Sequence, residues 1–137
     1  SYVVPTSDNT SVGFTTSDFN SGYTSSAIGD GVYLDSSSTW QKWDKGTSEA
    51  TYGGLLGIAL EVKASGNALK VALSGSFIYC TAFPPLTIGS KVWMDDAGAM
   101  VVTRPDSNDH ANRVVGWAVH GDKVLFQPST DYVIYKT

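Results

Sequence analysis

The stretch IGDGVYLD at residues 28–35 returns later in the chain as IGSKVWMD at residues 88–95, with four of the eight positions identical. Two further blocks follow each copy in the same order: LLGIAL (55–60) corresponds to VVGWAV (114–119), and KVAL (70–73) corresponds to KVLF (123–126). One such match can arise by chance, but three matches in the same order predict a duplicated module.

The repeated blocks have the composition of β-strands. Each first block continues from Ile-Gly into a short run of β-branched and aromatic residues and ends at an Asp before a polar turn. A return run follows at 39–43 in the first copy and at 99–103 in the second, so each copy is expected to begin with a β-hairpin. Gly121 and Asp122 predict a tight two-residue turn in the second copy.

A glycine lies in the middle of the next expected strand of each copy, at Gly57 and at Gly116. Glycine inside a strand predicts a bend or a close approach of another backbone. Further strands are expected at 76–81 and 132–136, and no segment has a helical period over ten residues. The sequence therefore predicts an all-β fold, a small β-barrel or sandwich built from two duplicated β modules.

Residues 1–27 differ from the rest of the chain, because they are rich in Ser, Thr, Asn and Gly and their apolar residues are isolated. We expect them to form an extended N-terminal arm before a β domain of residues 28–137, whose two copies are 28–81 and 88–137. The arm either becomes ordered on a neighbouring surface or wraps its own domain. The candidate partner-interface residues of the arm are Val3, Val4, Phe14, Phe19 and Tyr23.

Composition and charge exclude several classes of function. The chain has 137 residues, which predicts one domain, and a formal net charge of −4. The first basic residue is Lys42, and the basic residues are scattered, so we expect no binding to nucleic acid or to anionic membranes. The longest apolar run, 55–60, is far shorter than the roughly 20 residues that span a bilayer. The single cysteine, Cys80, excludes an internal disulfide and is expected to be buried.

The residue types needed for catalysis or metal binding do not form a convincing pattern. Asp35 and Asp95 occupy equivalent repeat positions and are a conceivable carboxylate pair for glycoside hydrolysis. Both precede turns, however, where Asp is favoured because it accepts hydrogen bonds from the turn backbone. The segment 106–110 resembles part of a calcium loop but lacks its glycine and its distal glutamate. We therefore expect no catalytic residue, metal site or cofactor.

Four tryptophans suggest a surface on which sugars stack. Trp93 and Trp117 occupy repeat positions that hold Tyr and Ile in the first copy, which predicts that they belong to the core. Trp40 and Trp43 have no aromatic equivalents and are the candidates for an exposed aromatic patch. Their burial against the arm is the alternative that the sequence favours over glycan binding.

The repeated blocks resemble a known family at three quoted stretches, IGDGVYLDSSSTWQKWDKGTSEATYGGLLGIAL (28–60), IGSKVWMDDAGAMVVT (88–103) and RVVGWAVHGDKVLFQPSTDYVIY (113–135). They are similar to small β-domains of tailed-phage virion proteins, which include capsid decoration (cement) proteins and domains of head and tail fibres. The resemblance extends over the two repeat copies, and its motifs are structural.

The resemblance implies a non-enzymatic structural component of the virion, often trimeric, on a capsid surface or within a fibre. The expected function is capsid decoration or a capsid-attached head-fibre domain that stabilises the particle surface. The expected partner is the major capsid protein or another virion protein, with a homotrimer as the expected assembly. The alternative function is a receptor- or glycan-binding tail-fibre module.

Overall fold

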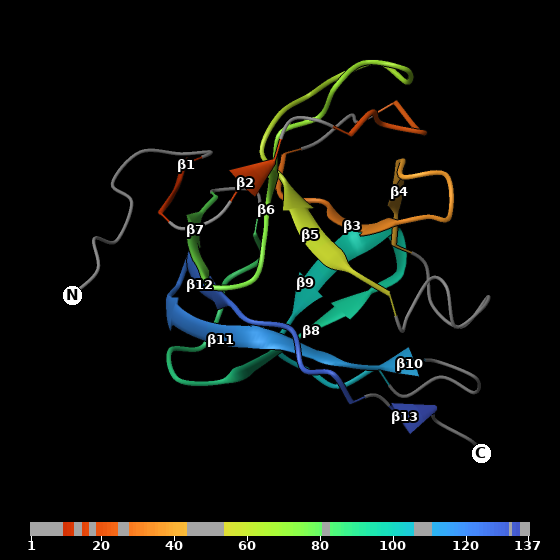
Figure 1. The fold of residues 1–137 in the computed structure, drawn as a ribbon. Helices are drawn as coiled ribbons and strands as arrows, with labels where there is room; N and C mark the ends of the chain where they lie inside the picture. Colours follow the sequence, from red (N-terminus) through yellow and green to blue (C-terminus); the bar gives the residue numbers. More distant parts are fainter. Residues whose placement is uncertain are drawn as a thin grey trace.

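The computed structural model describes residues 10–12, 15–16, 19–24, 28–43, 54–80, 83–105, 111–131 and 133–134. Within these residues the chain forms antiparallel β-strands and one 3₁₀ turn, Asp96–Gly98. The strands make two large sheets that pack face to face, which Figure 1 shows from the side. The predicted all-β fold is confirmed, and the architecture is a small sandwich.

One sheet has six strands and the other has five. The six-stranded sheet has the order β1 (Thr10–Val12), β7 (Ser76–Tyr79), β12 (Lys123–Phe126), β11 (Val114–His120), β8 (Lys91–Asp95) and β9 (Ala99–Val101). The five-stranded sheet has the order β2 (Thr15–Thr16), β6 (Val71–Ala72), β5 (Leu56–Ala59), β3 (Gly31–Leu34) and β4 (Trp40–Lys42). A separate pair joins β10 (Ala111–Asn112) to β13 (Val133–Ile134).

The repeated blocks occupy equivalent places in the two sheets. Strands β6–β5–β3–β4, which we call the first module, have the same neighbour order as β12–β11–β8–β9, which we call the second module. The residue pairing corresponds as well: Val32 opposite Gly57 matches Val92 opposite Gly116, and Ile58 opposite Ala72 matches Trp117 opposite Leu125. The hairpin expected at Gly121 and Asp122 joins β11 to β12.

The described parts of the predicted arm are strands and edge segments of the sandwich. β1 pairs with β7 in the six-stranded sheet, and β2 pairs with β6 in the five-stranded sheet. Asn20 and Ser21 form isolated bridges with Ala68 and Trp40. The segment before residue 28 therefore adds strands to both sheets. Val3, Val4 and Phe14 lie outside the described residues.

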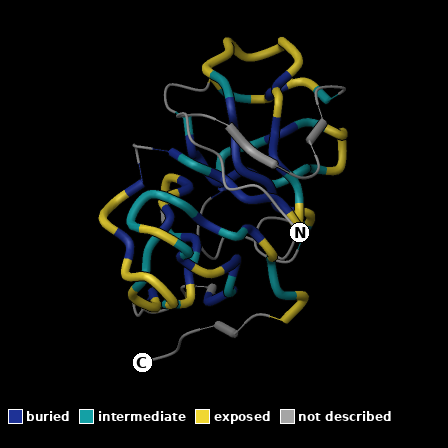
Figure 2. The backbone as a smooth tube through the Cα atoms, turned by 90° about the vertical axis from the view of Figure 1, so that its left-hand side faces the viewer, coloured by how far each residue is buried: buried dark blue, intermediate teal, exposed yellow. Residues whose placement is uncertain are grey.

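Two hydrophobic cores lie on opposite faces of the five-stranded sheet. The main core fills the space between the two sheets, and a smaller outer core covers the far face of the five-stranded sheet. Figure 2 shows the buried residues along the middle of the molecule and the exposed ones gathered on loops. Cys80 is buried in the main core, as expected.

The two modules do not turn equivalent faces toward each other. We call one face of each module the a-face: in the first module it carries Tyr33, Ile58 and Ala72, and in the second Trp93, Trp117 and Leu125. We call the opposite face the b-face: in the first module it carries Val32, Leu34, Trp40, Ala59 and Val71, and in the second Val92, Met94, Met100, Ala118 and Val124.

The main core is the a-face of the first module packed on the b-face of the second. The b-face of the first module forms the outer core instead. The a-face of the second module is turned outward, so the packing between the modules is head-to-tail rather than twofold symmetric.

Candidate functional site

The candidate exposed patch of Trp40 and Trp43 is wrong. Both rings are buried, and Trp40 lies against the arm residue Phe19, as the favoured alternative of burial against the arm predicted. The relative exposures of the two tryptophans are 0% and 1%, so neither ring is available to a ligand. Side chains alternate along a strand, and two residues three positions apart therefore point to opposite faces. Trp40 lies in the outer core and Trp43 in the main core. A spacing of three positions therefore does not favour a shared patch.

Phe19 and Tyr23 of the predicted arm lie on the chain's own outer core. The Phe19 ring meets Trp40 edge-on, with 6.4 Å between the centroids and 69° between the planes. Between Phe19 and Tyr23, the Gly22 amide donates a hydrogen bond to the Trp40 carbonyl at 2.8 Å. The arm was expected either on a neighbouring surface or on its own domain, and its described segment 19–23 packs on its own domain. A role for these residues in binding a partner stays a prediction.

A small charged cluster holds this segment to the first module. The Asp30 carboxylate lies 3.8 Å from the Lys42 ammonium and accepts a hydrogen bond from the Tyr23 hydroxyl at 3.4 Å. Lys42 also lies over the Tyr23 ring, 5.8 Å from its centroid. Burial raises the pKa of Asp30, because it disfavours the charged form more than Lys42 and Tyr23 stabilise it.

Asp35 is a turn residue, as the sequence predicted. Its carboxylate accepts hydrogen bonds from the amides of Ser37 at 2.9 Å and Thr39 at 3.0 Å, and from Gln41 Nε2 at 3.0 Å. Slight burial acts to raise the pKa of Asp35, but these hydrogen bonds, led by that of Gln41, outweigh it and lower the pKa. All of this carboxylate's interactions serve the turn.

The turn that follows Asp95 lies at the other end of β3. The Gly98 amide donates to the Trp43 carbonyl at 3.1 Å, and a Cβ at Gly98 would lie 2.5 Å from the Gly31 carbonyl oxygen. Gly31 begins β3, whereas Asp35 directly follows its last residue, Leu34. The two turns therefore mark opposite ends of one strand, which does not favour a shared carboxylate site.

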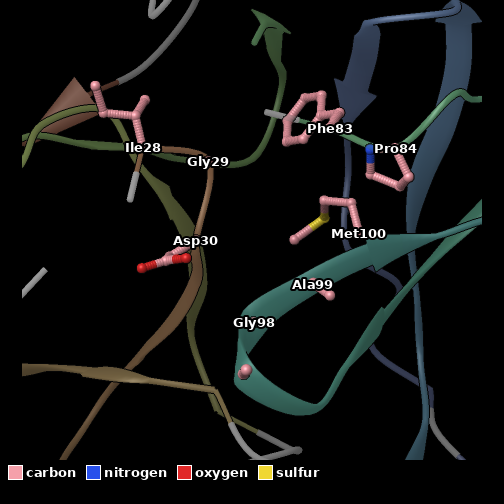
Figure 3. A pocket seen from close by; sticks show the side chains of 9 residues that line it. Ile28, Gly29, Asp30, Phe83, Pro84, Gly98, Ala99 and Met100 are labelled. Atoms are coloured by element: carbon pink, nitrogen blue, oxygen red, sulfur yellow. The ribbon is translucent and has the colours of Figure 1, made fainter. Parts of the chain in front are cut away.

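A cavity of about 190 Å³ opens between the two modules. It is lined by Ile28, Gly29, Asp30, Phe83, Pro84, Ala97, Gly98, Ala99 and Met100. Figure 3 shows Phe83 and Met100 on one side and the carboxylate of Asp30 directed away from them. The charge that this carboxylate carries therefore points toward the Lys42 cluster, and the cavity is an apolar hollow without an aimed catalytic group among its described lining residues.

The described residues hold no group of three or more His, Cys, Asp or Glu that is placed to bind a metal ion. The calcium-like segment 106–110 lies outside the described residues. No helix in the described part of the chain is long and apolar enough to cross a membrane.

The outward a-face of the second module is the candidate functional site. Trp117 lies at the centre of this face and is 39% exposed. It is directly opposite Leu125 of β12 on one side and Lys91 of β8 on the other. Trp93, half-buried, lies opposite Val114 on the same face. The face thus combines two indole rings, aliphatic side chains and an exposed lysine, which are features of an interaction surface.

A polar edge borders this face. Lys123 lies over the Tyr79 ring, 4.7 Å from the centroid, and its ammonium is 3.2 Å from an Asp122 carboxylate oxygen. The same oxygen lies 3.0 Å from His120 Nδ1. Slight burial acts to raise the pKa of Asp122, but the hydrogen bonds and charges of His120 and Lys123 outweigh it and lower the pKa.

The predicted core position of Trp93 and Trp117 is wrong. Trp93 is half-buried on the outward a-face, and Trp117 is exposed there. Its repeat partner Ile58 is buried in the main core, but the second module turns the equivalent face outward. Leu125 and Lys91 lie directly opposite Trp117. The sequence held no local signal for this exposure, because alternation along the strands does not say which face of a module meets the other sheet.

Comparisons with protein-family models, with curated proteins and with solved structures found no match for this chain.

Proposed function

We propose that this chain is a non-enzymatic structural protein of a phage virion, a capsid decoration protein or a capsid-attached head-fibre domain that binds and stabilises the particle surface. The observation that carries the proposal is the outward a-face of the second module, where Trp117 is 39% exposed beside the half-buried Trp93. A contiguous half-apolar face on a small domain is suited to binding a protein surface. The resemblance of the repeated blocks to phage virion β-domains supports the same function.

The partner in this proposal is the major capsid protein or another virion protein, and the assembly is a homotrimer. Repetition on a symmetric shell multiplies weak contacts into avidity, so a modest face on each copy is sufficient. The net charge of −4 is unfavourable for contact with packaged nucleic acid and supports a position on the outside of the particle.

The test is binding to particles assembled from the major capsid protein encoded by the same genome. Trp117→Asp places a charge at the centre of the a-face and is expected to weaken binding about 100-fold, the effect of losing a central aromatic anchor. Val62→Asp is the matched control, because Val62 is an exposed apolar residue in the loop of the first module. Wild-type protein that does not bind such particles, or unchanged binding by Trp117→Asp, contradicts the proposal.

A receptor- or glycan-binding fibre module remains the second candidate, now on different residues. The exposed Trp117 ring with Lys91 beside it is the specific observation in its favour, since sugars stack on indoles and bond to nearby polar groups. Binding of wild-type protein, but not of Trp117→Ala, to a glycan array supports this candidate. An array without any bound glycan counts against it.

A further inference from the structure

The interface between the two modules inside the chain does not close on itself. The a-face of the first module meets the b-face of the second, so the second module still offers an a-face and the first still offers a b-face. Contacts of this head-to-tail kind close into a ring or extend from molecule to molecule unless one end is covered. Among the described residues, the segment 19–23 covers the end at the first module.

We propose that the outward a-face of the second module binds the b-face of the first module in a second copy of this chain, and that segment 19–23 controls this assembly by occupying the same b-face. The inference goes beyond the proposed virion function and does not require it. Both use the a-face of the second module, so in any one copy the two contacts are alternatives. The interface already present inside the chain is its template.

Each side of the proposed contact has a counterpart in the existing interface. The a-face residues Trp93 and Trp117 stand where Tyr33 and Ile58 pack in the main core. The b-face of the first module carries Val32, Leu34, Trp40, Ala59 and Val71 where the second module offers Val92, Met94, Met100, Ala118 and Val124 to the main core. Both surfaces are therefore of a kind that this fold buries.

The size of the side chains indicates that the two occupants are alternatives. Segment 19–23 contributes two aromatic rings to the outer core, Phe19 and Tyr23. The a-face of the second module offers two indole rings, Trp93 and Trp117, which are bulkier than their repeat partners in the main core. When the segment leaves, the space of two rings opens on the b-face, and the larger a-face has room to enter.

The segment is held on the first module by noncovalent contacts, so its release is a matter of competing contacts. The contacts comprise five backbone hydrogen bonds with Trp40, Gly66, Asn67 and Leu69, the edge contact of Phe19 with Trp40, and the Tyr23 contacts with Asp30 and Lys42. Binding of the segment to another surface would expose the b-face and permit head-to-tail growth.

The test compares purified variants by sedimentation velocity over a range of concentrations. Phe19→Ser/Tyr23→Ser loosens the segment and is expected to give species larger than the wild-type assembly, increasing with concentration. Adding Trp117→Asp is expected to weaken this growth about 100-fold, because a charge replaces the central ring. Adding Val62→Asp, the matched control, is expected to leave the growth unchanged, since Val62 lies outside both faces.

Several results would overturn the proposal. One is a folded double variant that keeps the wild-type size, and another is growth that Trp117→Asp does not reduce, which indicates unspecific aggregation. If circular dichroism shows that the double variant has lost its β-sheet, Tyr23→Ser alone is measured, and its failure to grow overturns the proposal equally. Particle binding is not part of this measurement, so failure here leaves the proposed virion function standing, and failure of particle binding leaves this assembly standing.

Discussion

Two glycines without a Cβ atom, Gly57 and Gly116, allow neighbouring strands of each module to lie close together. A Cβ at Gly116 would lie 2.1 Å from the Leu125 carbonyl oxygen, and a Cβ at Gly57 would lie 2.2 Å from Val71 Cγ1. The close approach that the sequence predicted at these strand-interior glycines is confirmed in both modules. Glycine is required here for space rather than for an unusual backbone angle, since neither residue has a positive φ.

Gly116→Ala is expected to destabilise the protein by about 3 kcal/mol, because a backbone carbonyl cannot move aside without disturbing the β11–β12 ladder. Urea unfolding measures the change. Gly121→Ala is the matched control, since its Cβ would come no closer than 4.0 Å to the Leu86 carbonyl oxygen. Equal stability of the two variants would show that the strands have room for a methyl group.

The raised pKa of Asp30 predicts that the free energy of unfolding depends on pH. The folded state binds the Asp30 proton more tightly than the unfolded chain, so ionisation of Asp30 removes stability as the pH rises above its unfolded pKa of about 4. Asp30→Asn cannot ionise, and its stability relative to wild type is expected to increase as the pH rises above about 4, until Asp30 of the folded wild type is fully ionised. Urea unfolding at several pH values checks this slope.

Asp35→Asn provides the control for that experiment. The pKa of Asp35 is lowered, so its contribution to stability is complete above its unfolded pKa of about 4 and is lost only as the pH falls further. The difference between Asp35→Asn and wild type is therefore expected to stay flat where that of Asp30→Asn changes. Parallel curves for the two variants would argue against burial as the cause at Asp30.

At the scale of elements, the segment 19–23 behaves as part of the body. It lies over the b-face of the first module and hydrogen-bonds to Trp40 and to the loop that holds Asn67. Strands β1 and β2, from the same N-terminal region, extend one sheet each. Loss of this region therefore removes cross-strand hydrogen bonds and uncovers a hydrophobic core.

Phe19→Ala is expected to lower the stability by about 1–3 kcal/mol and to shift the fluorescence of Trp40 to longer wavelength as water reaches its ring. Thermal unfolding and fluorescence spectra measure the two effects. The Trp40→Phe variant serves as the control, because the Phe19→Ala spectral shift should disappear in its background. A shift that persists there would show that another tryptophan is responsible.

Across the whole molecule, a buried arginine ties the two modules together. Arg113 directly precedes β11 of the second module and donates from Nη1 to the Gly54 carbonyl at 2.7 Å, close to the start of β5 in the first. Its Nε donates to the Ser129 carbonyl at 2.6 Å. Burial lowers the pKa of Arg113. One planar side chain therefore satisfies carbonyl groups on segments that are far apart in the sequence.

Arg113→Lys is expected to destabilise the protein by about 1.5–3 kcal/mol, because an ammonium cannot reproduce the two directed hydrogen bonds of the guanidinium. Chemical unfolding measures the loss. Arg104→Lys, at an exposed position, is the matched control and should change little. Similar values for both variants would mean that Arg113 does not hold the modules together.

Local patterns determined much of this protein from the sequence alone. The strands around residues 31–34 and 91–95, the tight turn at Gly121 and the turn role of Asp35 all depend on neighbouring residues. The equivalence of the repeated blocks is also visible in sequence, and the two sheets pair these blocks in matching registers. Such features are predictable because each is determined by contacts within one hairpin or one turn.

The tertiary structure alone decided which face of each module was buried. Alternation along a strand determines which side chains share a face, but it does not say which face meets another sheet, since both faces of each module carry apolar residues. Ile58 is therefore buried while its repeat partner Trp117 lies open, and Trp40 is covered by residues from the predicted arm. Which face is buried depends on long-range packing between the two sheets, and the spacing of residues along the chain does not determine it.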